Sequence, residues 1–444
     1  MSTTTAPAST GPSVHGSKDR LKTAVAAGVG TSVENYDFVA YGTASALYFG
    51  AVFFPDNDPF VGTLLAFATL AVGFLMRPVG GAVGGYLADR HGRKPVLVGA
   101  MLVMGGATVL IGLLPTYAQV GVLAPVLLVA VRMVQGLAFG AEWGGAITMA
   151  YEHAPWNRRG MYAAIPQSGN PLGIALASTV FLLSADLEGD WKWRLPFLLS
   201  SVLVIVALIV RARLSESPEF EAVKASGERE PNPLLTTVRR DWRSVVRVIA
   251  LRIVESFAYY STATYLLSYI SDRNPDARPV ALGAITAASV VAIFVTFAAG
   301  SLTDRIGRRP VYIAGCLAAM AFAFPMYLLT NDGSSALIVV VFVVGIGLIH
   351  ACLTGAQGSL LTEQFRTANR TSGASLGYQL AAALGGFAPF LAAIAVNAFG
   401  WPGASMLYMI AAGIGLVGIL ATRETWGRAE RERVAALIAA ETRS

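Results

Sequence analysis

Long apolar runs separated by short polar loops fill most of this chain of 444 residues. A helix rises 1.5 Å per residue and the hydrocarbon core of a bilayer is about 30 Å thick, so about 20 apolar residues suffice to cross a membrane. Runs of this length, closed by Gly, Pro or charge, predict twelve membrane-spanning helices. They cover residues 22–49, 60–87, 95–114, 120–151, 160–184, 193–211, 245–270, 280–302, 310–329, 335–361, 371–398 and 404–421.

One long polar segment, 213–243, interrupts this pattern near the middle of the chain and contains Pro218, Pro231 and Pro233. The first twenty residues have no apolar stretch, so they do not form a secretory signal peptide. We therefore expect five parts. These are a disordered cytoplasmic tail at 1–21, an N-terminal six-helix bundle at 22–211, a cytoplasmic linker at 212–244, a C-terminal six-helix bundle at 245–422 and a cytoplasmic tail at 423–444.

Composition supports the bilayer as the solvent of this protein, since 55% of residues are hydrophobic, 14% are charged and the mean hydropathy is +0.58. The net charge of +6 does not indicate nucleic acid, because the basic residues sit in short clusters between apolar runs. The loops on one side of the predicted membrane carry most of them, which places that side and both termini in the cytoplasm. The basic residues of these loops are Arg90, Arg93, Lys94, Arg158, Arg159, Arg305, Arg308, Arg309, Arg366 and Arg370, against Lys192, Arg194, Arg273 and Arg278 on the other side.

An internal repeat supports the two-bundle plan. The segment Asp-Arg-His-Gly-Arg-Lys-Pro starting at Asp89 matches Asp-Arg-Ile-Gly-Arg-Arg-Pro starting at Asp304, at an offset of 304 − 89 = 215. Glu152 and Glu363 begin a second, weaker match at an offset of 363 − 152 = 211. Two matches at nearly one offset indicate a duplicated six-helix unit, as in transporters with parallel repeats.

With these motifs the chain resembles the major facilitator superfamily, whose signature between the second and third helices is Gly-x-x-x-Asp-Arg-x-Gly-Arg-basic. Other segments are similar to its metabolite:proton symporter branch. The matching segments are Gly85 through Lys94, Gly300 through Arg309, Glu34 through Phe38, Arg77-Pro78, Arg132 through Gly136 with Glu142, and Glu216 through Phe220. The resemblance implies an all-α membrane protein, with twelve transmembrane helices in two pseudo-symmetric six-helix bundles, that works by alternating access.

Acidic residues in the first predicted helix are candidates for the proton site. Glu34, Asp37 and Tyr41 are spaced to share one helical face near mid-membrane, and we expect that face to line the transport cavity. Burial favours the neutral form of a carboxyl group, so one of the two acids is expected to carry the co-transported proton. A permanent pair with a basic residue is the alternative.

Arg132, in the fourth predicted helix, is expected near mid-depth, where a guanidinium needs an acid or an anionic substrate. In the superfamily the matching residue is associated with proton transfer. Gln135 follows on a neighbouring stripe, and Gln167 in the fifth helix is a further candidate for hydrogen bonds in the cavity.

Arg252, Glu255 and Tyr259 form the corresponding stripe of the seventh predicted helix and are expected to contact substrate or proton. An ion pair between Arg252 and Glu255 without any ligand role explains their spacing equally well. His350, in the tenth helix, is either a proton site or a neutral hydrogen-bonding group.

A second group of residues is expected to serve gating rather than substrate binding. Arg77 lies toward the cytoplasmic end of the second predicted helix, where its side chain is expected to snorkel. The repeated loops are expected to cap helix ends and to pair across the cytoplasmic interface when the cavity faces outward. The gating candidates are Arg77, Asp89, Arg90, Arg93, Glu142, Asp304, Arg305 and Arg308.

These residues favour proton-coupled symport of a small organic acid over the alternatives, because the predicted membrane interior holds one arginine per bundle as well as buried acids. A zwitterionic osmolyte such as proline or betaine is the second possibility. A non-transporting membrane sensor or enzyme is the third, and no phosphate-binding loop or metalloprotease motif supports catalysis. We expect a monomer in the cell membrane with no cofactor and no nucleic-acid partner, which uses the proton as coupling ion and a carboxylate as substrate.

Overall fold

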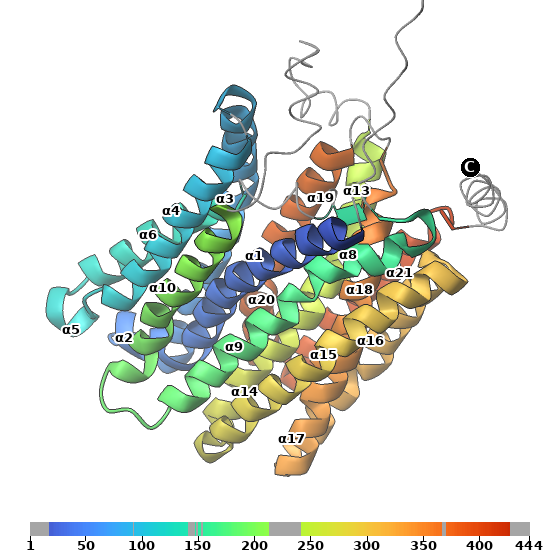
Figure 1. Ribbon diagram of the computed structural model, residues 1–444. Helices are drawn as coiled ribbons and strands as arrows, with labels where there is room; N and C mark the ends of the chain where they lie inside the picture. Colours follow the sequence, from blue (N-terminus) through green and yellow to red (C-terminus); the bar gives the residue numbers. More distant parts are fainter. Residues whose placement is uncertain are drawn as a thin grey trace, which may run out of the picture.

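The computed structural model describes residues 17–91, 93–140, 147, 150–151, 154–212, 241–365 and 370–426. Every regular element in this part of the chain is a helix, and the helices run side by side as a bundle (Figure 1). We call residues 17–212 the first half and residues 241–426 the second half. The division into two bundles at 22–211 and 245–422 stays a prediction, and most of the predicted linker lies outside the described residues.

The described residues of the first half form six helical runs, in agreement with the predicted number. In chain order they are α1 (Ser17–Ala44) continued by η1 (Ser45–Phe49) and α2 (Gly50–Phe53); α3 (Pro59–His91); α4 (Arg93–Leu113); α6 (Leu123–Gly140), preceded by α5 (Tyr117–Val120); α8 (Arg159–Gln167), preceded by η2 (Trp156–Arg158) and followed by α9 (Gly169–Ser184); and α10 (Trp191–Ala212).

Those of the second half, apart from 366–369, form six more. They are α13 (Trp242–Tyr259) continued by η3 (Tyr260–Tyr265) and α14 (Leu266–Arg273); α15 (Arg278–Ile306), preceded by η4 (Pro275–Ala277); α16 (Arg308–Asn331); α17 (Ser335–Phe342) continued by η5 (Val343–His350) and α18 (Ala351–Thr362); α19 (Arg370–Gly385) followed by α20 (Ala388–Phe399); and α21 (Trp401–Leu420).

Eight helices among the described residues are long and apolar enough to span a bilayer. Each predicted run corresponds to one observed run, so the predicted twelve-helix plan is confirmed. The fourth run differs most from its prediction of 120–151, since α6 ends at Gly140 and most residues from 141 to 153 lie outside the described part.

Several runs predicted as single helices are interrupted. A break at Ser168 lies between Pro166 and Pro171, and another at Gly386 and Phe387 precedes Pro389. Proline has no N–H to donate to the preceding turn, which explains both positions. The runs that contain η1, η3 and η5 instead widen into π-helix without a proline.

Apolar side chains cover the outside of the bundle, as contact with lipid requires. Leu183, Phe399 and Val417 are 75%, 76% and 68% exposed. Because the polar backbone is satisfied within each helix, such a surface is compatible with hydrocarbon and would be unfavourable in water.

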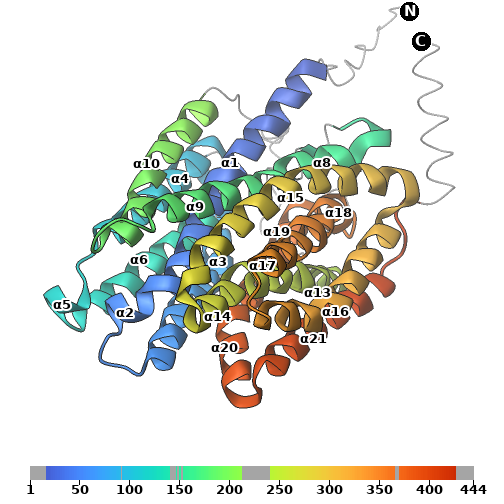
Figure 2. The same cartoon turned by 90° about the horizontal axis from the view of Figure 1, so that it is seen from below.

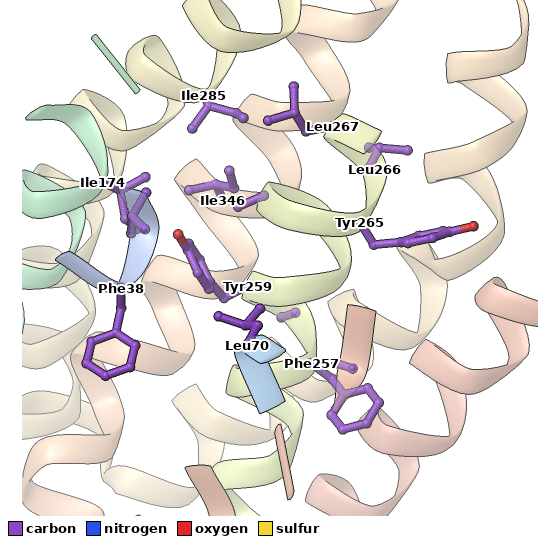
Figure 3. Packing of buried hydrophobic residues seen from close by; sticks show 14 of the residues in the cluster. Phe38, Leu70, Ile174, Phe257, Tyr259, Tyr265, Leu266, Leu267, Ile285 and Ile346 are labelled. Atoms are coloured by element: carbon purple, nitrogen blue, oxygen red, sulfur yellow. The ribbon is translucent and has the colours of Figure 1, made fainter. Parts of the chain in front are cut away.

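The two halves meet along long helix pairs. In both views α9 lies between α10 and α15 (Figures 1 and 2), and α3 packs against α19. Figure 3 shows Phe38 and Leu70 of the first half close to Tyr259 and Ile346 of the second, so one apolar core continues across the contact. This core encloses the polar groups described next.

Candidate functional site

A small cavity of about 30 Å³ lies between the two halves. That is room for water and not for a metabolite, so the cavity must widen to admit a substrate. Both halves supply its wall. The lining residues are Asn35, Phe38, Val39, Phe74, Arg77, Phe139 and Asn170 of the first half, and Arg252, Glu255, Ser256, Tyr259, Tyr260, His350, Tyr378 and Ala382 of the second.

The second half's wall centres on the ion pair of Arg252 Nη1 with Glu255 Oε2 on α13. Arg252 also donates from Nη2 to the Tyr378 hydroxyl at 2.7 Å and from Nη1 to Gln357 Oε1 at 3.3 Å. Arg252 is 7% exposed and Glu255 is 1% exposed. The alternative of an internal pair is therefore realised, and the same pair also faces the cavity.

His350 joins this network from η5. Its Nε2 lies 3.1 Å from Glu255 Oε1, and the Thr354 hydroxyl donates to the same carboxylate oxygen at 3.3 Å. The ring of Tyr259 lies 5.4 Å from the imidazole. The predicted stripe of the seventh helix thus lies together, and His350 joins it, which the sequence did not predict.

Arg77 occupies a position that the sequence did not predict. Its guanidinium carbon lies 3.9, 4.0 and 3.9 Å from the ring centroids of Phe38, Phe74 and Phe139, and the residue is only 4% exposed. The expectation that it snorkels toward the membrane surface is wrong, because α3 continues to His91 and leaves Arg77 near the middle of the helix. Its side chain lines the cavity instead.

The aromatic cage of Arg77, defined as Phe38, Phe74 and Phe139, offsets part of the cost of burying this charge but supplies no negative charge to pair with it. A cation over an aromatic ring gains about 0.5–2 kcal/mol. Transfer of an ion into a protein interior still costs several kcal/mol after relaxation. No hydrogen bond or ion pair of Arg77 occurs in the described part of the chain, and its Nε has no partner there.

Asp37 lies in a separate network behind the cavity wall of the first half. The hydroxyl of Thr108, on α4, donates to Asp37 Oδ2 at 2.7 Å, and Gln135 Nε2 donates to the Thr108 oxygen at 2.7 Å. Gln135 Oε1 accepts from Arg132 Nη1. Asp37, Gln135 and Arg132 are each 0% exposed. Two neutral side chains thus connect the buried acid to the buried cation.

The expected orientation of the Glu34, Asp37 and Tyr41 face is therefore wrong. From α1 the cavity is lined by Asn35, Phe38 and Val39, while Asp37 turns toward α4. The ring of Tyr41 lies under the Arg132 guanidinium at 4.1 Å, and its hydroxyl bonds to Thr69 at 2.7 Å. Helical spacing grouped Asp37 with Tyr41, and both lie around Arg132, but apolar neighbours on every side gave no indication of which face points inward.

Glu34 and Gln167 are also buried outside the cavity lining, each 3% exposed. Gln167 Nε2 donates to the Thr354 carbonyl oxygen at 3.5 Å, which is a contact between the halves. The role of both residues in binding stays a prediction.

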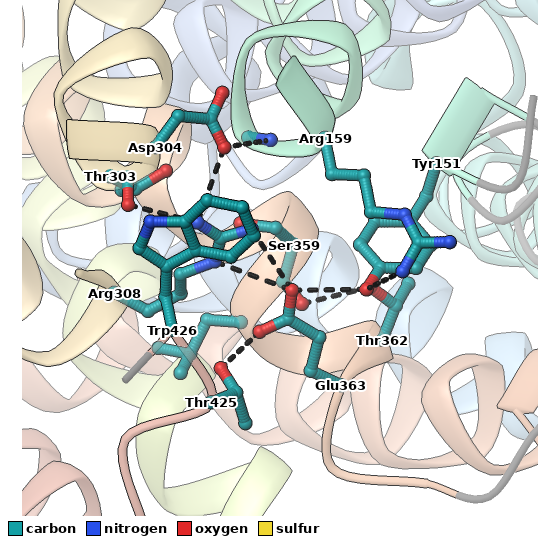
Figure 4. A network of polar contacts seen from close by, with 12 residues as sticks. Tyr151, Arg159, Thr303, Asp304, Arg308, Ser359, Thr362, Glu363, Thr425 and Trp426 are labelled. Atoms are coloured by element: carbon teal, nitrogen blue, oxygen red, sulfur yellow. Dashed lines mark hydrogen bonds and ion pairs between the residues drawn. The ribbon is translucent and has the colours of Figure 1, made fainter. Parts of the chain in front are cut away.

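The repeated loop of the second half, where α15 ends and α16 begins, lies in a dense polar network (Figure 4). Asp304 accepts hydrogen bonds from the backbone N–H groups of Gly160 at 2.8 Å and Met161 at 2.9 Å, at the start of α8 in the other half. A carboxylate is favourable at a helix N-terminus. The predicted contact across the halves is thus present, but its partner is backbone rather than a basic side chain.

Arg308 connects Asp304 to a second acid. Its Nη1 lies 3.2 Å from Asp304 Oδ1, and its Nη2 lies 3.1 Å from Glu363 Oε1. The hydroxyl of Tyr151, in the first half, donates to the same oxygen of Glu363 at 3.0 Å. Arg305 is exposed, and the side chains of Asp89, Arg90, Arg93 and Glu142 lie outside the described residues.

A short segment after α21 completes this network and was missed in the sequence. Glu424 accepts from the backbone N–H groups of Arg308 at 3.0 Å and Arg309 at 2.9 Å, at the N-terminus of α16. The indole of Trp426 covers the Arg308 guanidinium at 4.7 Å (Figure 4). No periodic pattern marks such a contact between residues more than 100 positions apart.

Comparison with known proteins gives one family. The model of the Major Facilitator Superfamily matches residues 38–388. The inner membrane metabolite transport protein YhjE of Escherichia coli is 38% identical over 422 residues, which cover 91% of this chain and 94% of that protein. The shikimate transporter of the same organism is 37% identical over 378 residues, or 83% and 86% of the two chains.

More distant relatives agree. The proline/betaine transporter of Salmonella typhimurium is 33% identical over 422 residues, which cover 92% of this chain and 84% of that protein. Among solved structures, the partially occluded inward-open form of the xylose transporter XylE from E. coli aligns with a TM-score of 0.69 at 19% identity, covering 93% of this chain and 100% of that one. At that identity the likeness concerns the fold alone.

Proposed function

The chain belongs to the major facilitator superfamily, and we propose that it is a secondary active transporter that moves a small organic acid together with a proton. Membership makes it a multi-pass membrane transporter and not an enzyme. The relative named for shikimate, which is a carboxylic acid, supports an acidic substrate. Relatives named for proline and betaine keep a zwitterionic osmolyte as the second candidate.

The charges on the cavity wall are the observation that carries this proposal. Arg77 and Arg252 contribute two cations, while Glu255 is the only carboxylate among the described lining residues. A cavity with an excess of positive charge favours an anion, and guanidinium groups are suited to carboxylates because their donors are arranged as a fork.

Two acids are proposed to take part in proton coupling. Asp37 is fully buried and connected to Arg132 through Thr108 and Gln135, so a proton on Asp37 changes the net charge beside Arg132. Glu255 with His350 is the corresponding group in the second half. Buried ionisable groups of this kind are costly in a membrane and are kept where they serve transport.

Gating is proposed for the polar network around Asp304, Arg308 and Glu363. It ties α8 of the first half to α15 of the second through Asp304, and Tyr151 of the first half to Glu363 at the end of α18, so it must break when the halves separate at this end. The other residues predicted to take part in gating are Asp89, Arg90, Arg93, Arg305, Glu142 and Arg77. For Arg77, its position on the cavity wall favours a role in binding instead. The excess of basic loop residues supports a cytoplasmic location of this end and of both termini.

Uptake into proteoliposomes tests the proposed function. Purified protein is reconstituted, a pH gradient with an alkaline interior is imposed, and accumulation of shikimate, benzoate, succinate, citrate, proline and glycine betaine is measured. We expect at least one acid to accumulate above its external concentration and a protonophore to abolish the accumulation. Accumulation of proline or betaine alone would establish the second candidate. Absence of both solute and proton flux would contradict symport.

A further inference from the structure

Arg77 is the cation in the cavity wall whose charge no described acid neutralises. The other cation on the wall, Arg252, is paired with Glu255, and that pair is further bonded to Gln357, Tyr378 and His350. Within the described part of the chain, Arg77 lies over the three rings of its cage and makes no hydrogen bond or ion pair, although it is only 4% exposed. The described wall therefore carries a net charge close to +1, located at Arg77.

We propose that Arg77 binds the carboxylate of the substrate and that the cavity selects an organic anion with a single negative charge, an inference that rests on the proposed function. A monoanion neutralises Arg77 and leaves the Arg252–Glu255 pair intact. A dianion would bring one carboxylate in excess, which must either displace Glu255 from Arg252 or stay unpaired in a buried site. The wall thus discriminates by charge as well as by shape.

The cage also disfavours a quaternary ammonium substrate. Aromatic rings recognise such groups by cation–π attraction. In this cavity the rings of Phe38, Phe74 and Phe139 already hold the Arg77 guanidinium at 3.9–4.0 Å. A betaine would have to compete for these rings while adding positive charge beside Arg77.

The remaining lining residues indicate what the rest of the substrate is like. Asn35, Asn170 and Tyr260 present neutral hydrogen-bonding groups, and Phe74 and Phe139 present flat apolar surface. These groups suit a compact ring or branched body with a few hydroxyl or keto groups.

The cage also connects the site to the contact between the halves. The ring of Phe74 lies 5.3 Å from that of Tyr260 and packs directly on Gly386, where a Cβ atom would collide with it. An anion that draws the guanidinium away from the rings acts on side chains that both halves share.

The test uses purified full-length protein, with the thermal unfolding midpoint as a measure of binding. Benzoate and shikimate are the monoanions, benzamide and methyl shikimate are their neutral counterparts, phthalate is a dianion, and glycine betaine is the zwitterion. We expect at least one monoanion to raise the midpoint and its neutral counterpart, phthalate and betaine to have a much smaller effect. No shift with either monoanion, or equal shifts with the neutral compounds, would contradict the proposal.

Arg77→Met separates a binding role from a structural one. If Arg77 binds the substrate anion and has no structural partner, its replacement by an apolar side chain of similar length leaves the unfolding midpoint of the ligand-free protein unchanged or raises it. The same replacement weakens monoanion binding by at least about tenfold. If Arg77 is a structural residue, the opposite is expected: the unfolding midpoint of Arg77→Met falls, and the protein that remains folded binds the monoanion with unchanged affinity. Arg77→Lys provides the same comparison should the methionine variant fail to fold, because lysine keeps the positive charge but lacks the forked donors of the guanidinium. We expect Arg77→Lys to bind the monoanion more weakly than wild type. Unchanged binding would contradict the proposal.

Proteoliposome uptake keeps this inference distinct from the function on which it rests. Wild-type uptake of an acid together with unchanged KM in Arg77→Met would overturn the assignment of Arg77 alone. Failure of wild-type protein to take up any acid in response to a pH gradient would overturn the proposed function.

Discussion

Asp37 is a carboxylic acid with only one described hydrogen-bond donor, the hydroxyl of Thr108, and its Oδ1 has no described partner. It is fully buried, while the nearest cation in its network, Arg132, is connected through Gln135 and Thr108. Such an arrangement tolerates both a neutral and an ionised carboxyl group, because Thr108 keeps its position in either state. A proton carrier needs this tolerance, whereas a permanent structural pair would be in direct contact.

Asp37→Asn keeps the size of the side chain and its acceptor for Thr108 but removes the ionisable group. We expect proton-driven accumulation of substrate to fall by at least about tenfold, since no charge change remains to couple the gradient to transport. The rate at which labelled substrate exchanges for unlabelled substrate across the membrane, in the absence of a pH gradient, should stay within about twofold of the wild-type rate. Both are measured in the same proteoliposomes.

Glu255→Gln is the matched variant in the second half. If it reproduces the loss of accumulation with exchange intact while Asp37→Asn accumulates substrate normally, the proton site belongs to Glu255 and His350 instead. Loss of exchange in Asp37→Asn would show that Asp37 is needed for binding or movement and not for coupling alone.

Residues such as Arg77 and Asp37 mark the limit of inference from sequence. Their burial follows directly from their places in long apolar runs, and the grouping of Arg252, Glu255 and Tyr259 follows from helical spacing. The direction in which each side chain points does not, because a helix surrounded by apolar helices and lipid has no polar face to orient it. Arg77 was misplaced for a further reason: α3 extends beyond its apolar run to His91.

At the scale of elements, none of the helix interruptions was predicted from the sequence, although proline positions explain two of them. The π-helical turn at Val343–His350 is mostly apolar, whereas the one at Tyr260–Tyr265 consists mainly of Tyr, Ser and Thr, so no common composition marks the two. Both lie beside the cavity, and Tyr260 and His350 line it. A π turn shifts the side chains that follow it around the helix, and such turns are frequent at functional sites. Their energetic origin is tertiary packing, which local sequence does not encode.

Glu424 contributes to the second half as a cap supplied from outside the helix that it stabilises. Its carboxylate accepts two hydrogen bonds from the first turn of α16, where Gly307 begins the helix in a conformation with a φ of 104°. We expect Glu424→Ala to destabilise the protein by about 1–2 kcal/mol, as for loss of an N-cap with a favourable charge. The measurement is the thermal unfolding midpoint in detergent.

Glu424→Gln is the control, because an amide oxygen still accepts one of the two bonds but carries no charge. Its midpoint should lie between those of wild type and Glu424→Ala. Equal midpoints for all three proteins would mean that the contact contributes nothing to stability.

For the whole molecule, contacts between the halves occur at both ends of the bundle. At one end Asp304 caps α8, and at the other the hydroxyl of Ser178, on α9, lies 2.9 Å from that of Thr286, on α15. The repeat and the apolar runs predicted twelve helices and the fold, and both are confirmed. Which of these contacts break during transport cannot be read from sequence, since one amino-acid sequence encodes every conformation of the cycle.

A disulfide between positions 178 and 286 tests whether the end opposite the repeated loops must open. The two hydroxyl oxygens lie 2.9 Å apart, so the side chains at these positions point toward each other, as a disulfide between them requires. We expect oxidised Ser178→Cys/Thr286→Cys protein to transport at less than about a tenth of its reduced rate, because alternating access needs α9 and α15 to separate at this end. The single variants contain the same natural residues Cys316 and Cys352 and should be unaffected by oxidant. A crosslinked protein that still transports at its reduced rate would mean that α9 and α15 move as one unit, and the opening would then have to lie between other helices, such as α3 and α19.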